Sequence, residues 1–184
     1  ALDNNDAFIL DGMRLLIDGN DCEPEQGNMH ILFGTEDFQL TYFFAEYPDG
    51  TKAMYRKHGD FLFPLTQLTD AAGNIIDFIY EMDNNRCYID KIQYGAHISG
   101  SSHFADISFS YKSRTDVLIG YEKGVEIKLS RLLDKIECHN GTSLLHTYTF
   151  TYQTDKVSLL TQVDCDNLNP LRFYYGYSDN TREY

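Results

Sequence analysis

Hydrophobic and polar residues alternate with a period of two along much of the chain. The clearest stretches are FADISFSYK (104–112), TYTFTY (147–152) and LRFYYGY (171–177). This alternation of apolar and polar positions is typical of half-buried β-strands, whereas an amphipathic helix needs apolar residues three and four positions apart. No long segment has the helical spacing, and the mixed pattern of residues 129–136 also favours a strand. In 147–152 we expect the aromatic residues on one face and the threonines on the other.

Turn-forming residues separate these stretches. They are Pro48-Asp49-Gly50, Ala72-Gly73-Asn74, Asn84-Asn85 and Asn140-Gly141. Asn and Gly tolerate the positive φ angles of tight hairpin turns. The sequence therefore predicts an all-β fold, in which antiparallel hairpins or a meander pack as a sandwich or as a curled sheet.

A similar unit occurs three times, at 64–80, 131–152 and 159–177. Each copy contains a short apolar run, a polar turn and a second run rich in Phe and Tyr. A single hairpin cannot bury its apolar face, so neighbouring hairpins must stack to do so. We interpret the repeated unit as structural.

The domain organisation is expected to be one β-rich module, residues 1–184. The stretch GAHISGSSH (95–103) is the best candidate for a flexible loop, and it divides an N-terminal segment (1–95) from a C-terminal segment (103–184). Because the sequence starts without Met, we expect a fragment of a larger protein.

The charge balance is acidic, with 15 basic and 28 acidic residues and a formal net charge of −13. Such a charge repels phosphate backbones and anionic membranes, so nucleic-acid binding is not expected. No apolar run approaches the roughly 20 residues of a membrane-spanning helix, so we expect no membrane insertion by this segment. The N-terminus also lacks the basic start of a signal peptide.

The cysteines, at 22, 87, 138 and 165, are far apart and form no C-x-x-C pair. Structural zinc needs closely paired ligands, which these spacings do not supply. The even count permits disulfides, but the sequence assigns no pairs.

The six histidines have no metal-ligand spacing, and no nucleophile elbow surrounds the serines of the loop at 95–103. His97 and His103 lie in that loop, on either side of its Gly/Ser run, so a hydrolase using it is a weaker alternative. Two acidic stretches, 18–23 (DGNDCE) and 164–167 (DCDN), offer oxygen ligands but are explained by turns. Asn140 begins a glycosylation sequon that is also a hairpin signal.

These motifs lead to one expectation: no catalytic, cofactor-binding or metal-ligating residues, no cofactor, and no enzyme activity. The 14 tyrosines leave a second function open, because aromatic faces stack on sugars. A carbohydrate-binding module of a bacterial surface protein is therefore the alternative to a structural role.

Four stretches together resemble a known toxin region: FILDGMRLLIDG (8–19), residues 64–95, residues 107–152, and SLLTQV with LNPLRFYYG (158–176). They are similar to the region shared by the Salmonella virulence-plasmid toxin and the B components of insecticidal toxin complexes. Wall-associated proteins with RHS or YD repeats share it too. The similarity is weakest over 20–60, which leaves the N-terminal topology open.

The resemblance implies a large secreted or cell-surface bacterial virulence protein. In that family this region is a β-rich scaffold preceding a propeller or an RHS shell, and no catalytic residue is assigned to it. The implied function is a non-catalytic scaffold module. Its implied partners are neighbouring domains of the same polypeptide and other toxin-complex subunits.

Overall fold

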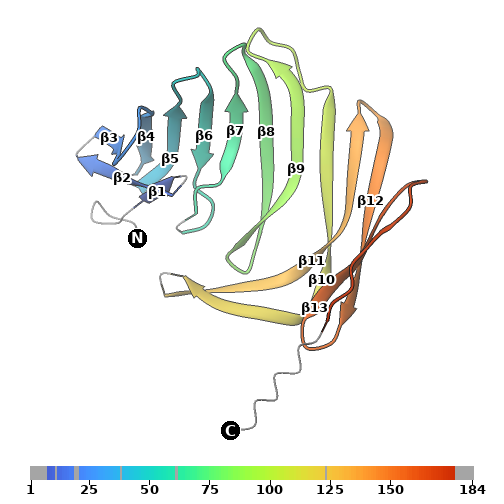
Figure 1. The fold of residues 1–184 in the computed structure, drawn as a ribbon. Helices are drawn as coiled ribbons and strands as arrows, with labels where there is room; N and C mark the ends of the chain where they lie inside the picture. The colour runs from blue at the N-terminus through green and yellow to red at the C-terminus, as the bar shows by residue number, and fades with distance from the viewer. Residues whose placement is uncertain are drawn as a thin grey trace.

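The computed structural model describes residues 8–10, 12–18, 21–37, 39–60, 62–122 and 124–176, which form fourteen β-strands and no helix (Figure 1). None of the described residues therefore belongs to a helix that could cross a membrane. The strands are β1 (Phe8–Leu10), β2 (Met13–Asp18), β3 (Asp21–Pro24), β4 (His30–Glu36), β5 (Gln39–Glu46), β6 (Lys52–Arg56), β7 (Leu65–Thr69), β8 (Asn74–Asp83), β9 (Arg86–His97), β10 (Ala105–Glu122), β11 (Val125–Asn140), β12 (Ser143–Thr154), β13 (Ser158–Cys165) and β14 (Leu171–Arg172).

All described strands belong to one antiparallel sheet, and each strand pairs with its neighbours in sequence. The predicted all-β meander is confirmed. Of the two packings predicted, the structure has the curled sheet: the ribbon fans from β1 to β9 and then turns where β10 and β11 bend (Figure 1). The sheet is open, with β1 at one edge and β14 at the other.

The three repeated units are three hairpins of this sheet. They are the pairs β7–β8, β11–β12 and β13–β14. The predicted turns lie between strands, and Asn84 and Asn85 have φ angles of 49° and 60°. Asn tolerates this left-handed region better than most residues, which explains why it occupies this tight turn.

The burial of residues 148–152 follows the predicted alternation in β12. Tyr148, Phe150 and Tyr152 are half-buried, while Thr149 and Thr151 are exposed; Thr147, expected on the same face as the other threonines, is half-buried. The segment with mixed signals, 129–136, lies within β11, as the flanking pattern indicated.

The best-buried core lies in the N-terminal strands, around Phe43 of β5. Its buried members are Leu15, Cys22, Ile31, Phe43 and Ala45. The Phe8 and Phe63 rings meet the Phe43 ring edge-on, with centroid distances of 5.0 and 5.1 Å. Four of these five buried residues lie within residues 20–60, the region in which the sequence similarity is weakest.

The stretch 95–103 begins inside a strand, because β9 extends to His97. Gly95 has a φ of 90°, and the Phe104 ring occupies the space where a side chain at this position would start. An aromatic ring over a strand glycine replaces packing that the glycine lacks. The strands on either side of this stretch, β9 and β10, pair directly, so the sheet is continuous across it.

The curl of the sheet is fixed where the β8–β9 turn meets β11. The Lys128 amide donates to the Asn84 carbonyl at 3.2 Å, and the Asn85 side chain donates to the Glu126 carbonyl at 3.0 Å. These bonds join residues more than 40 positions apart.

Charged side chains reinforce the same junction. Arg131 of β11 donates to Asp83 at 3.0 Å and to Glu81 at 2.8 Å, and the Ser130 hydroxyl donates to Asp83 at 2.7 Å. The hydroxyl of the buried Tyr88 accepts the Ser130 amide at 3.1 Å. These contacts lower the pKa of the Asp83 carboxyl, first through Ser130 and then through Arg131.

A bulge in β10 provides a second set of contacts between strands that are distant in sequence. Between Ser113 and Leu118 the register with β11 shifts, and the bulge places Arg114 and Asp116 side by side. Asp116 in turn accepts hydrogen bonds from the amide and hydroxyl of Ser158, at the start of β13. The bulge thereby ties the bend of the long hairpin to the C-terminal strands.

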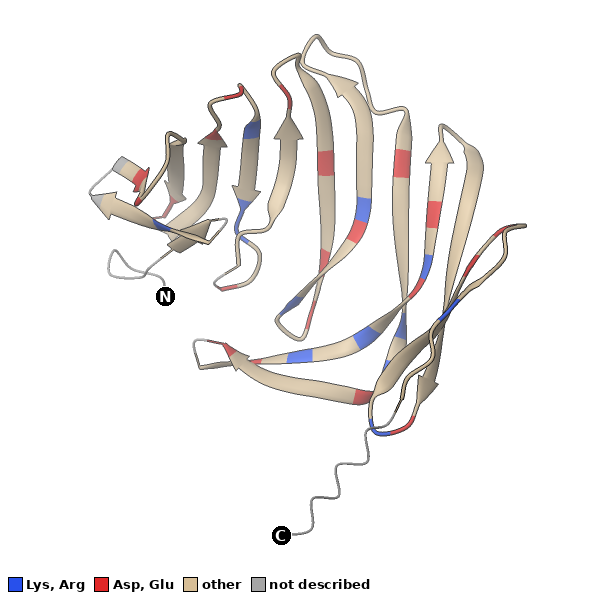
Figure 2. Ribbon diagram, in the orientation of Figure 1, with Lys and Arg blue, Asp and Glu red and all other residues tan. Residues whose placement is uncertain are grey.

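Acidic and basic residues are interspersed along the strands and turns (Figure 2). Several pairs lie within ion-pair distance, including Lys112 with Asp134 and Lys128 with Glu126. The acidic excess is therefore spread over the described surface.

Candidate functional site

The two loop histidines considered from the sequence have different partners. His97 lies with Nδ1 2.8 Å from the Ser99 hydroxyl and Nε2 2.9 Å from the Ala72 carbonyl oxygen. His103 lies with Nε2 2.9 Å from Asp77 of β8. These contacts join the loop to the β7–β8 hairpin, which is a structural role.

The two acidic stretches differ in what they place together. Asp18 ends β2 and Asp21 begins β3, two strands that pair antiparallel, and Gly19 and Asn20 lie outside the described residues. Residues 164–167 end β13, where Asp166 has a φ of 38°. This agrees with the turn interpretation, and the turn also brings Asp166 to a histidine on the neighbouring strand.

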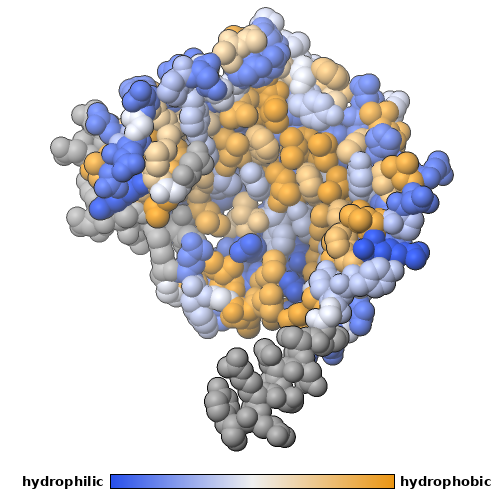
Figure 3. Space-filling view, in the orientation of Figure 1, coloured by the Kyte–Doolittle hydropathy of each residue, from blue (hydrophilic) through white to orange (hydrophobic). Residues whose placement is uncertain are grey.

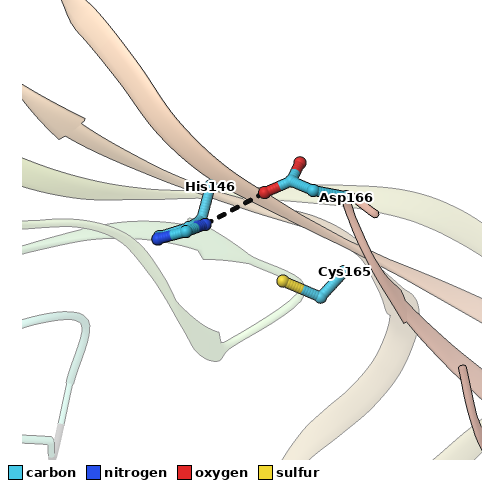
Figure 4. Close-up of side chains that lie close together, drawn as sticks. All are labelled: His146, Cys165 and Asp166. Carbon is cyan, nitrogen blue, oxygen red and sulfur yellow. Dashed lines mark hydrogen bonds and ion pairs between the residues drawn. The ribbon is translucent and has the colours of Figure 1, made fainter. Parts of the chain in front are cut away.

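His146, Cys165 and Asp166 form a compact group at the β12–β13 hairpin (Figure 4). The His146 Nδ1 atom lies 3.0 Å from Asp166 Oδ2, and Cys165 points toward the same space. One ligand atom from each residue lies within 4.8 Å of the other two. Among the described residues, this is the one group of three or more His, Cys, Asp and Glu side chains that brings potential metal ligands so close.

The sheet fixes each member of this group differently. Cys165 is buried at the end of β13, opposite Tyr148 in the register. Both Asp166 oxygens accept the Thr147 amide, at 3.2 and 3.4 Å, which holds the carboxylate in place. His146 is exposed, so the group is accessible from solvent.

Polar neighbours surround the Cys165 thiol. A hydrogen bond to this thiol raises the pKa of the Tyr148 phenol. Cys138 of β11 is the cross-strand partner of His146, and burial raises the pKa of its thiol, with a further contribution from Cys165. A second thiol therefore lies beside the group.

Sequence reasoning missed this group because 19 and 20 residues separate His146 from Cys165 and Asp166. Motif spacing detects ligands on one turn or helix, whereas these ligands meet through strand pairing. A correct register for the β12–β13 hairpin, set by Tyr148 opposite Cys165, was the signal that could have found it.

The four cysteines, all within the described residues, are free thiols. Burial raises the pKa of the Cys22 thiol to about 11, so it remains protonated at neutral pH and packs as a small apolar residue.

The sheet leaves many large apolar side chains exposed, at several places along it. Apolar residues also gather over the middle of the face shown in Figure 3. Among the residues over 55% exposed are Ile9, Ile98, Phe104, Ile119, Tyr121, Leu168, Leu171 and Tyr174. Monomeric soluble proteins rarely expose large contiguous apolar areas, and such areas often mark contact surfaces.

Two of the grooves on the described surface are lined mainly by residues of the C-terminal strands. The larger, of about 380 Å³, is lined mainly by the bent ends of β10 and β11, with Leu118, Ile119, Ile127 and Leu129 as its apolar members. The smaller, of about 220 Å³, lies beside Phe173, Tyr174 and Tyr175 and also contacts Gln153 and Thr161. The first is suited to apolar contact, and the second combines aromatic and polar groups.

No protein-family model matches this chain, and no curated protein matches it in sequence. Solved structures do match it in fold. The N-terminal domain of the effector protein SpvB from Salmonella typhimurium strain LT2 aligns with a TM-score of 0.65 at 12% identity, over 88% of this chain and 69% of that domain.

Toxin-complex structures match equally well. The TcdB2-TccC3-Cdc42 structure aligns with a TM-score of 0.66 at 14% identity, over 92% of this chain. The Photorhabdus luminescens Tc holotoxin pore aligns with a TM-score of 0.67 at 15% identity, over 95% of this chain. This chain spans 12% of the length of each of these two matching chains.

At these identities the likeness establishes the fold. The resemblance to the virulence-plasmid toxin and toxin-complex B components, proposed from sequence motifs, is confirmed at this level. The chain has the fold of a segment that occurs in toxin proteins.

Proposed function

We propose that this chain is a non-catalytic β-rich scaffold module of a larger secreted or cell-surface bacterial protein of the toxin-complex-B or RHS type. Its partners are neighbouring domains of the same polypeptide, and other toxin-complex subunits where these are present. The fold supports the proposal, because the matching solved structures are an effector domain and multi-component toxins.

The observation that carries the proposal is the apolar surface that the single sheet leaves open. The groove formed by β10 and β11 exposes Leu118 and Ile119, which are 45% and 57% exposed. An adjacent domain that covers this groove would remove these side chains from water, which stabilises the contact by about 25 cal/mol for each Å² of apolar surface buried. A scaffold module uses such a surface for packing.

The covering can be tested with Ile119→Ser in two settings. In the 184-residue chain alone we expect the free energy of unfolding to change by no more than about 0.5 kcal/mol, because Ile119 is exposed there. In the longer natural polypeptide we expect the Ile119→Ser variant to show faster amide hydrogen exchange over residues 117–122 than the unaltered polypeptide, because the substitution weakens the contact with the neighbouring domain. Lys128→Ser, on the same bent hairpin, is the control and should leave exchange unchanged.

The exchange rates of the unaltered protein in the two settings test whether a neighbouring domain covers the groove. Residues 117–122 should exchange more slowly in the longer polypeptide than in the chain alone, because the neighbouring domain covers them. Equal exchange rates in the two settings would reject the covered-groove model.

The non-catalytic part of the proposal has a separate test. We expect no turnover of glycosides, esters, peptides or nicotinamide donors by this chain, because the loop histidines are held by structural contacts. Turnover that His97→Ala or His103→Ala abolishes would overturn it.

A second candidate function is glycan binding at the smaller groove. Tyr174 is 87% exposed and lies beside Phe173 and Tyr175, with the polar Gln153 and Thr161 close by. Aromatic faces that stack on sugars, next to amide and hydroxyl groups, are suited to binding carbohydrate. Calorimetric titration with soluble oligosaccharides tests this function: binding that Tyr174→Ala abolishes and Tyr121→Ala preserves would favour it over the scaffold.

A further inference from the structure

We infer that His146, Cys165 and Asp166 form a surface binding site for a single thiophilic divalent cation, with Zn²⁺ the best match (Figure 4). This inference goes beyond the proposed scaffold function and does not depend on it. It also departs from the expectation of no metal ligands. That expectation was based on the spacing of ligand residues in the sequence, which does not reveal ligands brought together by strand pairing.

The three side chains supply the donor set that Zn²⁺ prefers. Imidazole nitrogen, thiolate sulfur and carboxylate oxygen are its usual protein ligands, and a thiolate disfavours the hard cations Mg²⁺ and Ca²⁺. Three protein ligands leave a fourth tetrahedral position for water or another donor.

The distances are close to those of a formed site. With Zn²⁺ about 2.0–2.3 Å from each ligand, tetrahedral ligand atoms lie about 3.3–3.8 Å apart. His146 Nδ1 and Asp166 Oδ2 are 3.0 Å apart, and all three ligand atoms fit within 4.8 Å. We expect rotations of the side chains, without movement of the backbone, to place the three atoms around one ion.

Part of the site is already oriented. The Thr147 amide holds the Asp166 carboxylate, and the end of β13 holds Cys165 in a buried position next to Tyr148. Preorganised ligands lose less conformational freedom when an ion binds. The exposed ring of His146 leaves a path from solvent, and binding displaces the Cys165 thiol proton to solvent because the ligand is the thiolate.

The turn alone does not explain the group. A left-handed residue that accepts the Thr147 amide needs only the carbonyl oxygen of an Asp or Asn side chain. Neither the Cys165 thiol nor the His146 imidazole contributes to that turn, yet both converge on the Asp166 carboxylate. Cys138, opposite His146 on β11, adds a second thiol beside the site.

The test uses the reduced, chelator-treated 184-residue chain titrated with ZnCl₂ by calorimetry and with CoCl₂ by absorption spectroscopy. We expect one ion per chain, a thiolate-to-cobalt charge-transfer band in the near ultraviolet, and intense visible bands of a tetrahedral ion. Cys165→Ser should remove the charge-transfer band. His146→Ala and Asp166→Asn should each weaken Zn²⁺ binding by at least about tenfold, a loss that even outer-shell partners of metal sites produce.

Two variants keep the result interpretable. Asp166→Asn preserves the left-handed turn and an acceptor for the Thr147 amide, so it tests the charge without disturbing the fold. Cys87→Ser removes a thiol of β9 outside the group and should leave the cobalt spectrum unchanged. Absence of the charge-transfer band in the unaltered chain overturns the inference, as does full Zn²⁺ affinity in Asp166→Asn or equal loss of the band in Cys87→Ser.

Discussion

The Arg114 guanidinium lies against the Asp116 carboxylate in a two-bond pair, with Nε 3.0 Å from Oδ1 and Nη2 2.8 Å from Oδ2. The two side chains are only 6% and 10% exposed. A buried guanidinium is stabilised only when its charge is paired and its N–H groups are bonded, so this pair sits at a point where the fold depends on its geometry.

Removing one member of this pair should destabilise the protein strongly. Arg114→Ala leaves the Asp116 carboxylate without its charged partner, and we expect a fall in the urea midpoint clearly larger than that from breaking an exposed ion pair. Urea denaturation followed by circular dichroism measures it. Lys52→Ala, which breaks an exposed ion pair with Glu46, is the control and should cost less than about 1 kcal/mol.

The same pair predicts how stability depends on pH. The Arg114 side chain, followed by Ser158, holds the pKa of the Asp116 carboxyl well below its usual range. A carboxyl with a lowered folded-state pKa stabilises the fold above its unfolded pKa of about 3.9 and loses that contribution as pH falls further.

We therefore expect Asp116→Asn to lower the urea midpoint at pH 7 and to flatten its fall below about pH 4, relative to the unaltered chain. Asp60→Asn, at an exposed turn, serves as the control. Parallel curves for Asp116→Asn and the unaltered chain across this acid range would contradict the assignment.

Core substitutions should distinguish the two ends of the sheet. Phe43 is 4% exposed and packs against the rings of Phe8, Phe33 and Phe63, so Phe43→Ala should cost about 3–5 kcal/mol. Phe150 is half-buried, and Phe150→Ala should cost less because part of its ring is already in water. Denaturant midpoints of the two variants give the order, and an equal or larger loss for Phe150→Ala would mean that β12 is covered more fully than the sheet indicates.

A glycine and a ring should show coupled effects. Gly95→Ala introduces a side chain at φ 90°, which costs about 1–2 kcal/mol, and it also displaces the Phe104 ring. In the double variant Gly95→Ala/Phe104→Ala the collision is gone and the backbone strain remains. The double variant should therefore lose less stability than the sum of the single variants, and simple additivity would show that the ring does not rest on Gly95.

Local patterns were enough to predict the strands and their hairpins. Alternation at 147–152 indicated the faces of β12, and Asn84-Asn85 and Asn140-Gly141 indicated turns. Both patterns involve only a few neighbouring residues, so they can be recognised in the sequence. The meander follows from these, since every strand pairs with its sequence neighbour.

Features that depend on distant residues were not predicted. The role of the bulge at Arg114 and Asp116 depends on the hydrogen bond from Ser158, which lies 42 residues after Asp116 in the sequence. The bend that places Asn84 against Lys128 is likewise absent from any local pattern. His146 and Asp166 fall in the same class, which is why the candidate cation site appeared only with the strand register.

The placement of β1 and β14 at opposite edges of the sheet determines how the molecule responds to mechanical load. Tension between the two ends pulls across the strands and loads the ladder hydrogen bonds a few at a time, as in opening a zipper. Sheets loaded along their strands must instead break many such bonds at once. Hairpins can then peel away one after another from either edge, until the load reaches the β8–β9 turn held on β11 and the Arg114–Asp116 anchor. We expect these two sets of contacts to divide the sheet into parts that yield separately, so that the chain unfolds under force as a series of small units.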